Sequence, residues 1–366
     1  MSVTVAFVRE TAPGERRIAL TPETCKKLLA NKARVLIEAG AGTPASFPDD
    51  SYVGAEFIAD RQSVLGQADI LVCVQPPSNV ELAVLKPGAL LVGLLAPHAD
   101  PGRVDALAAG KISAFSLERL PRTTRAQAMD VLSSQAGMAG YKAVLIAAQL
   151  APRFFPMLTT AAGTIRPSKV LIVGAGVAGL QAIATARRLG AQVEGFDVRP
   201  ETREQIESLG GKFLDLGVSA KGEGGYAREL TAEERAEQQR RLADHLKSVD
   251  VIVTTAAVPG RPAPKIISAA MVAGMKPGSV IVDLAAETGG NCESTRPGET
   301  LDINGVTVAG PLNLASMGAL HASEMYARNV FNFVSLLLDK EGQLTLDWND
   351  ELVAKTCLAH AGEKRA

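Results

Sequence analysis

A polar segment between residues 121 and 135 holds the side chains whose types and spacing could do chemistry. It carries, in order, Arg122, Gln127, Asp130 and Ser133. None of these is a good general acid or base at neutral pH, but together they could bind a carboxamide and a pyrophosphate. Such a set can orient two reactants. Hydride transfer between two nicotinamides has this need, since it requires orientation and no proton transfer.

A second candidate site begins about forty residues later, where a predicted strand over residues 169–173 runs into a glycine-rich turn. In such a motif Gly174 allows a tight turn, Gly176 lets the backbone approach a pyrophosphate, and Gly179 allows close packing of helix on strand. The pyrophosphate would lie at the start of the helix that follows, near Val177, where free N–H groups and the helix dipole favour an anion.

The next predicted strand, residues 192–196, ends at Asp197, with Val198 and Arg199 directly after it. A carboxylate there accepts from both ribose hydroxyls of NAD and repels the 2′-phosphate of NADP. Arg199 complicates this, but we expect Asp197 to dominate. Because strand, turn, helix and terminal carboxylate occur in order, we predict that this chain binds NAD(H). Ala257, at the exit of a later strand, would lie on the same sheet edge.

Composition limits the class of protein. The 366 residues suffice for two domains, and 47% apolar residues can form a sizeable core. The net charge of −1 gives no basic surface for nucleic acid. Four scattered cysteines and four scattered histidines give little support for a metal site. Without a signal peptide or an apolar run of about 18 residues, we expect a cytoplasmic protein.

Predicted strands alternate with helical segments in two series, which favours right-handed crossovers and doubly wound sheets. The strands are expected at residues 3–7, 35–38, 70–74, 90–93 and 112–116, then at 169–173, 193–196, 251–255, 280–283 and 306–309. Long helices are expected over 133–151 and 319–338, and strand character over 343–359. No internal repeat is visible.

We therefore predict an α/β protein with two Rossmann-like, doubly wound parallel-sheet domains and a cleft between them. The first comprises residues 1–133 completed by 316–366. The second, residues 134–315, is the NAD-binding domain.

Several segments together resemble the NAD(H)-binding component, domain I, of the proton-translocating nicotinamide nucleotide transhydrogenases. The specific part is the pattern Arg-x-x-x-x-Gln-x-x-Asp-x-x-Ser, which begins at Arg122. The other resembling segments are residues 16–22, 139–143, 174–184, 224–227 and 283–291, so the resemblance covers nearly the whole chain.

The resemblance implies that Arg122, Asp130 and Ser133 orient the nicotinamide end of NADH, and that Gln127 reaches towards a second nicotinamide. It also implies that Gly225 and Tyr226 lie on a mobile loop that closes over the nucleotide. The implied reaction is direct hydride transfer from NADH to NADP⁺.

The implied assembly has three components. The resemblance implies a homodimer of this chain and a transhydrogenase beta subunit that holds NADP(H). A separate membrane-spanning subunit would couple the reaction to proton translocation. The chain would then be peripheral, held at the cytoplasmic face of the inner membrane through these partners.

Alanine dehydrogenase, a related family, is the competing interpretation. Oxidising an amine needs an acid/base group and a cation for the substrate carboxylate. That family's Lys, His and Asp positions align here with Gln75, Leu94 and Glu287, although Arg17 is retained. We interpret His98, four residues after Leu94, as a loop histidine. The missing Lys and His argue against amino-acid oxidation.

Two simpler interpretations stay open. Arg122 and Asp130 could form only a surface ion pair, which contributes little, and Gln127 could be a solvated loop residue. The chain could also be a non-catalytic, NAD-binding regulatory subunit, because a partner would supply half of the proposed active site.

Overall fold

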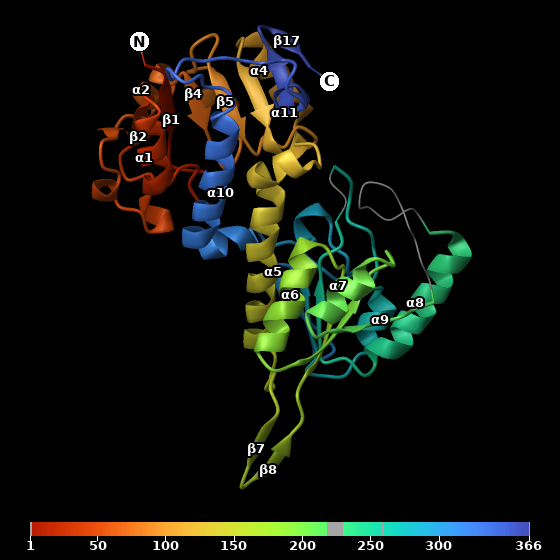
Figure 1. The fold of residues 1–366 in the computed structure, drawn as a ribbon. Helices are drawn as coiled ribbons and strands as arrows, with labels where there is room; N and C mark the ends of the chain where they lie inside the picture. Colours follow the sequence, from red (N-terminus) through yellow and green to blue (C-terminus); the bar gives the residue numbers. More distant parts are fainter. Residues whose placement is uncertain (1, 218–229, 258–259, 366) are drawn as a thin grey trace. The chain divides into compact units, whose positions relative to one another are not determined.

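The computed structural model describes residues 2–217, 230–257 and 260–365 (Figure 1). The chain folds into two compact units, which we call unit 1 (residues 1–135 and 316–366) and unit 2 (residues 136–315). Each unit contains one large sheet of mostly parallel strands flanked by helices. The predicted α/β class is therefore confirmed, with the difference that both sheets are mixed and not purely parallel.

The sheet of unit 1 has the strand order β17-β16-β6-β5-β4-β1-β2-β3. Its first six strands pair in parallel, whereas β16 and β17 pair antiparallel at one edge. The strands are β1 (Thr4–Phe7), β2 (Arg34–Glu38), β3 (Glu56–Ile58), β4 (Ile70–Val72), β5 (Leu90–Gly93), β6 (Ser113–Ser116), β16 (Cys357–His360) and β17 (Glu363–Lys364).

Helices cover both faces of this sheet because successive strand residues point to opposite sides. Val5 and Phe7 of β1 lie in one core, with α1 and α10, while Ala6 lies in the other, with α2 and α4. The helices are α1 (Pro22–Ala30), α2 (Arg61–Gln67), α3 (Asn79–Leu82), α4 (Pro101–Ala109), α10 (Ala319–Val334) and α11 (Glu351–Thr356).

The C-terminal tail differs in part from the expectation of strand character over residues 343–359, because α11 occupies the middle of that range. The side chain of Asp350 accepts a hydrogen bond from the N–H of Leu352 at 2.9 Å and caps the helix. The strand β16 begins only at Cys357.

The sheet of unit 2 has the order β11-β10-β9-β12-β13-β15-β14. Counted from the first strand of each sheet, both units share the order 3-2-1-4-5-6, in which the strand order reverses beside the first strand. The strands are β9 (Lys169–Val173), β10 (Gln192–Phe196), β11 (Lys212–Phe213), β12 (Val251–Thr254), β13 (Val280–Asp283), β14 (Thr300–Ile303) and β15 (Val306–Ala309).

Tight hairpins account for the antiparallel edge strands. Asn304 and Gly305 both have positive φ, 53° and 83°, between β14 and β15. Ala361 and Gly362 do the same between β16 and β17, with φ of 51° and 93°. Turns with two positive φ values match the twist of paired strands, so each adds an antiparallel strand to an otherwise parallel sheet.

Helices also cover both faces of the sheet in unit 2 (Figure 1). The unit 2 part of α5 packs with α6 on one face, and α8 and α9 pack on the other. The α5 helix spans the boundary between the two units in the sequence. The helices are α5 (Val131–Leu150), α6 (Val177–Arg188), α7 (Thr202–Ser208), α8 (Ala232–Leu246) and α9 (Ala269–Ala273).

A two-stranded hairpin, β7 (Leu158–Thr160) and β8 (Gly163–Ile165), extends away from the sheet of unit 2 (Figure 1). All six of its strand residues are exposed. Within the described residues, no helix has both the length and the apolar character needed to cross a membrane.

Candidate functional site

The turn between β9 and α6 brings together the three glycines of the predicted nucleotide site. Gly174 has a φ of +96°, and an added Cβ there would lie 2.6 Å from the hydroxyl of Thr255. An added Cβ at Gly179 would overlap the carbonyl oxygen of Gly174. By contrast, an added Cβ at Gly176 meets nothing within 4 Å. Close packing requires two of the glycines, and the third leaves open space beside the helix N-terminus, where Val177 is 47% exposed.

Asp197, directly after β10, is buried and already carries several hydrogen bonds. Its carboxylate accepts from the N–H of Ala175 at 2.8 Å, and the guanidinium of Arg199 binds both of its oxygens, at 2.9 and 2.7 Å. Burial alone would raise the pKa of Asp197, but the hydrogen bonds from Arg199 and Ala175 outweigh it and lower that pKa. The carboxylate is therefore ionised at neutral pH. Val198 packs partly buried against the core beneath.

The exit of β12 lies against the same turn. The hydroxyl of Thr255 donates to the carbonyl oxygen of Gly174 at 3.0 Å. The backbone of Ala256 is held by the side chain of Asn291, which accepts from its N–H and donates to its oxygen. Ala257, one residue further on, is exposed. The carboxyl ends of β9, β10 and β12 thus meet at one edge of the sheet, the edge at which such folds bind ligands.

The polar segment before α5 is a short 3₁₀ helix, η4 (Thr124–Met129), in unit 1. Arg122 and Gln127 are exposed on it. The backbone is anchored because the carbonyl oxygen of Ala128 accepts from the side-chain amides of both Asn329 and Asn332 on α10, each at 2.9 Å. The segment therefore presents its polar side chains from a fixed backbone.

Asp130 and Ser133 contact each other at the start of α5. The Asp130 carboxylate accepts from the N–H of Ser133 at 2.9 Å and from its hydroxyl at 2.5 Å. This is the geometry of a helix N-cap, which by itself explains why an Asp lies three residues before a Ser. Both side chains nevertheless remain partly exposed, so the cap does not consume them.

A buried polar network in unit 1 was not predicted from the sequence. The Arg17 guanidinium binds both oxygens of Glu15, at 2.8 and 2.6 Å, and donates to the side-chain oxygen of Gln135 at 2.9 Å. Gln75 donates to Glu15 at 3.0 Å. The carboxylate of Glu10 accepts from the backbone N–H of Gln75 at 3.0 Å. The network lies where β1 and β4 end, the edge that corresponds to the glycine turn of unit 2.

The two carboxyls of this network are shifted in opposite directions. Burial raises the pKa of Glu10 to about 7, although the N–H groups of Val74 and Gln75 act against it. Burial would also raise the pKa of Glu15, but the hydrogen bonds and charge of Arg17 prevail and lower it to about 2. Glu15 therefore stays ionised with Arg17, whereas Glu10 titrates near neutral pH.

The positions that align with alanine dehydrogenase residues are used structurally here. Gln75 is held by Glu15 in the buried network. Leu94 is partly buried against the core of unit 1. Glu287 is exposed and accepts from the N–H of Asn313 at 2.6 Å. His98 is exposed in the turn between β5 and α4.

The predicted site residues fall into two groups. Unit 2 brings together the glycine turn, Asp197 with its neighbours, and Ala257. Unit 1 brings together the residues of η4 and the first turn of α5. Gly225 and Tyr226 lie outside the described residues.

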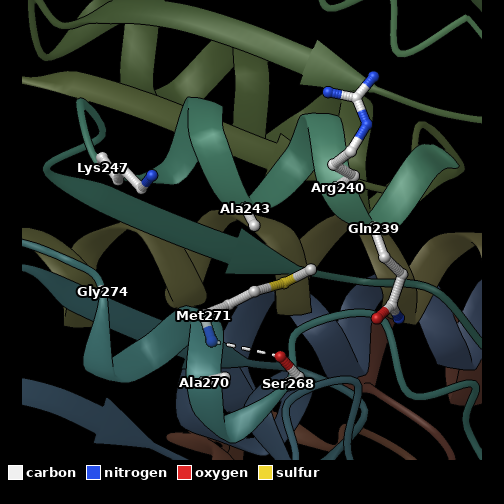
Figure 2. Close-up of a pocket in the computed structure, with 8 residues that line it drawn as sticks. All are labelled: Gln239, Arg240, Ala243, Lys247, Ser268, Ala270, Met271 and Gly274. Carbon is white, nitrogen blue, oxygen red and sulfur yellow. Dashed lines mark hydrogen bonds between the residues drawn. The ribbon is translucent and has the colours of Figure 1, made fainter. Parts of the chain in front are cut away.

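A cavity of about 300 Å³ between α8 and α9 carries no part of this site (Figure 2). The Ser268 hydroxyl accepts from the N–H of Met271 and so caps α9. The two cations of the cavity, Arg240 and Lys247, bind acidic residues of their own helix. Its lining is Gln239, Arg240, Ala243, Lys247, Ser268, Ala270, Met271 and Gly274.

Comparison with known families places the whole chain. The N-terminal domain of the alanine dehydrogenase/PNT family matches residues 6–139, and the C-terminal domain of that family matches residues 143–366. The first of the separate chains that make up the NAD(P) transhydrogenase alpha subunit of Rhodospirillum rubrum is 44% identical over 98% of this chain and 96% of its own length.

A solved structure of transhydrogenase from Sinorhizobium meliloti has a TM-score of 0.89 and 41% identity, and covers 98% of this chain and 99% of that one. The alanine dehydrogenase of Bacillus subtilis is 29% identical over 79% of this chain and 72% of its own. These findings confirm the predicted resemblance, and with it the prediction that the chain forms a portion of an NAD(P) transhydrogenase alpha subunit.

Glu10 provides a pH test of the buried network. The folded pKa of about 7 lies above the ordinary value of about 4.3, so the folded state holds this proton more tightly. That contribution to stability is complete below about pH 4.3 and is lost as pH rises through 7. Glu10→Gln should abolish the loss, because an amide oxygen still accepts the N–H groups but does not titrate.

We expect the free energy of unfolding of the unsubstituted chain to fall by roughly 1–3 kcal/mol relative to Glu10→Gln between about pH 5 and pH 8. Urea unfolding across that range measures the difference. Parallel pH curves for the two proteins would contradict the assignment.

Proposed function

The chain belongs to the alanine dehydrogenase/PNT family, and we propose that within this family it is the NAD(H)-binding component of a proton-translocating transhydrogenase. The observation that carries the proposal is the edge of unit 2, where a glycine turn, a helix N-terminus and the ionised Asp197 meet. These residues fit a dinucleotide, because Gly176 leaves room for a pyrophosphate and Asp197 can accept from ribose hydroxyls.

The nicotinamide end of the nucleotide is assigned to the polar residues of unit 1. Arg122 and the Asp130–Ser133 pair would orient the carboxamide, and Gln127 would reach towards the second nicotinamide. The supporting observation is that η4 holds these side chains on a backbone fixed by two amide hydrogen bonds from α10. A hydride moves with both electrons of its C–H bond from NADH to NADP⁺, so these residues need supply orientation only.

The competing amino-acid oxidation lacks its chemical groups here. Gln75 cannot act as a base and is committed to Glu15, and Leu94 has no titratable group. Arg17, the cation that would bind a substrate carboxylate, binds the carboxylate of Glu15 instead. Within this chain, the arrangement favours hydride transfer between nucleotides over oxidation of an amine.

The proposal includes the partners that the chain itself does not supply. NADP(H) would be held by a transhydrogenase beta subunit, and a separate membrane-spanning subunit would couple hydride transfer to proton translocation. The chain would associate with the inner membrane at its cytoplasmic face through these partners. We also propose a homodimer, supported by the exposed hairpin β7–β8, whose Leu158 and Ile165 are 37% and 45% exposed.

The experiment that tests the function uses the purified full-length chain. It should bind NADH more tightly than NADPH, leave NADH unoxidised with pyruvate and ammonia, and reduce NADP⁺ once the beta subunit is added. Light scattering of the same preparation should give the mass of two chains. Rapid NADH oxidation by pyruvate and ammonia would instead establish an amino-acid dehydrogenase. NADH binding without transfer to NADP⁺ in the assembled complex would leave the regulatory alternative.

Gln127→Asn tests the assignment at the nicotinamide. The shorter side chain should slow hydride transfer by about tenfold to a hundredfold, as a misplacement of about 1 Å can do. NADH affinity should stay within about twofold, because the residue would act between the nucleotides. Stopped-flow kinetics of the assembled complex and NADH titration measure the two effects. Gln62→Asn, at an exposed position of α2, is the matched control, and a large loss of NADH binding in Gln127→Asn would sink the assignment.

Asp197→Ala tests the choice of nucleotide. The substitution removes the acceptor for the ribose hydroxyls and releases Arg199 from its pairing with Asp197. We expect NADH to bind about tenfold more weakly and NADPH more tightly, since Arg199 could then contact a 2′-phosphate. The double variant D197A/R199A should lose the gain for NADPH. An unchanged ratio of the two dissociation constants in Asp197→Ala would refute the role of Asp197.

A further inference from the structure

Two neighbouring threonines at the end of β12 hold different parts of the sheet edge. Thr254 is fully buried, and its hydroxyl donates to the carboxylate of Asp283, at the end of β13, at 2.8 Å. The hydroxyl of Thr255 instead donates to the carbonyl oxygen of Gly174, after β9, at 3.0 Å. The exit of β12 is thereby tied to the strand on each side of it.

The backbone that carries Thr255 is fixed by Asn291. This side chain is fully buried and pairs with both backbone groups of Ala256, at 3.0 Å to the N–H and 2.7 Å to the oxygen. Its amide also donates to the carbonyl oxygen of Pro264 at 2.9 Å. The Ala256 backbone therefore cannot shift without breaking buried hydrogen bonds, each of which contributes about 1 kcal/mol.

Asp283 anchors the arrangement from below. Its buried carboxylate accepts from the Thr254 and Thr295 hydroxyls and from the N–H groups of Ala285 and Cys292. All four partners are uncharged, so every one of them is needed to offset the cost of burying the charge.

The peptide between Gly174 and Ala175 is held from both sides. Its carbonyl oxygen accepts from Thr255, and its N–H donates to Asp197 at 2.8 Å. Because a peptide is planar, these two hydrogen bonds together fix its orientation. The turn that would face the pyrophosphate and the carboxylate that would face the ribose are thus linked through one peptide.

We propose that Thr255 is a positioning residue for the dinucleotide: its hydroxyl holds the Gly174–Ala175 peptide that Asp197 holds from the other side. Space around it is already filled, since an added Cβ would lie 2.6 Å from its hydroxyl at Gly174 and 3.1 Å at Gly179. A side chain larger than Thr does not fit at this position, and one without a hydroxyl leaves the peptide free on one side. This inference rests on the proposed NAD(H) site.

The test compares Thr255→Val, which replaces the hydroxyl by a methyl group of similar size, with Thr255→Ser, which keeps it. Thr255→Val should weaken NADH binding about tenfold, and Thr255→Ser should restore affinity to within about threefold of the unsubstituted chain. ADP, which carries the ribose and two phosphates but no nicotinamide, should show the same loss. Equilibrium titration by fluorescence or calorimetry measures each dissociation constant.

Thr185→Val is the matched control. Thr185 is also buried in unit 2, and its hydroxyl donates to the Gln181 carbonyl within α6, away from the turn. It should lower the melting temperature of the nucleotide-free chain without changing NADH affinity. Should Thr255→Val fail to fold, Thr255→Ala removes the same hydroxyl without an added methyl contact.

The outcomes separate the two proposals. No binding of NADH by the unsubstituted chain overturns the proposed function itself. Binding by the unsubstituted chain that is equally tight in Thr255→Val, or a loss for NADH that ADP does not share, overturns the role of Thr255 alone. A loss that Thr255→Ser does not restore also overturns it.

Discussion

The peptide between Gly174 and Ala175 is the point on which the edge of unit 2 depends. Four strands meet there: β9 leads into it, β10 contributes Asp197, β12 contributes Thr255, and β13 holds β12 through Thr254. The glycines allow the close approach, because a Cβ at Gly179 would overlap the Gly174 oxygen. Side chains further away then serve to hold backbone in place, and the backbone presents the N–H groups and space that an anion needs.

The same strand order produces two different edges in the two units. In unit 2 the turn after the first strand is lined by glycines and leaves open space beside Gly176. In unit 1 the corresponding edge is filled by the chain's own carboxylates and Arg17, which satisfy one another. A buried charge needs such partners to be tolerated. One fold therefore supplies one edge with room for a ligand and one edge that is internally satisfied.

Local signals in the sequence predicted the strands, the long helices and the glycine turn, because each depends on residues within about one turn or one strand. Asp197 was predicted from its place at a strand end, but its pairing with Arg199 and Ala175 on both oxygens was not. The network of Arg17 and Gln135 joins residues 118 positions apart, which no periodicity reveals. The hairpin at Asn304 and Gly305 did carry a local signal, a two-residue turn of a type that joins antiparallel strands, although the strands around it suggest a parallel sheet. The strand order that the two units share leaves no visible repeat in the sequence, since it resides in the order of strands and not in side-chain identity.

The position of α10 in the chain has a consequence for synthesis on the ribosome. Unit 1 begins at the N-terminus, yet its core contains Tyr326, Val330 and Phe333 of α10, and its sheet ends in β16 and β17. All of unit 2 is translated before these parts exist. The first unit to be started is therefore the last to be completed, and the apolar surface that α10 covers stays without its partner while residues 136–315 are made.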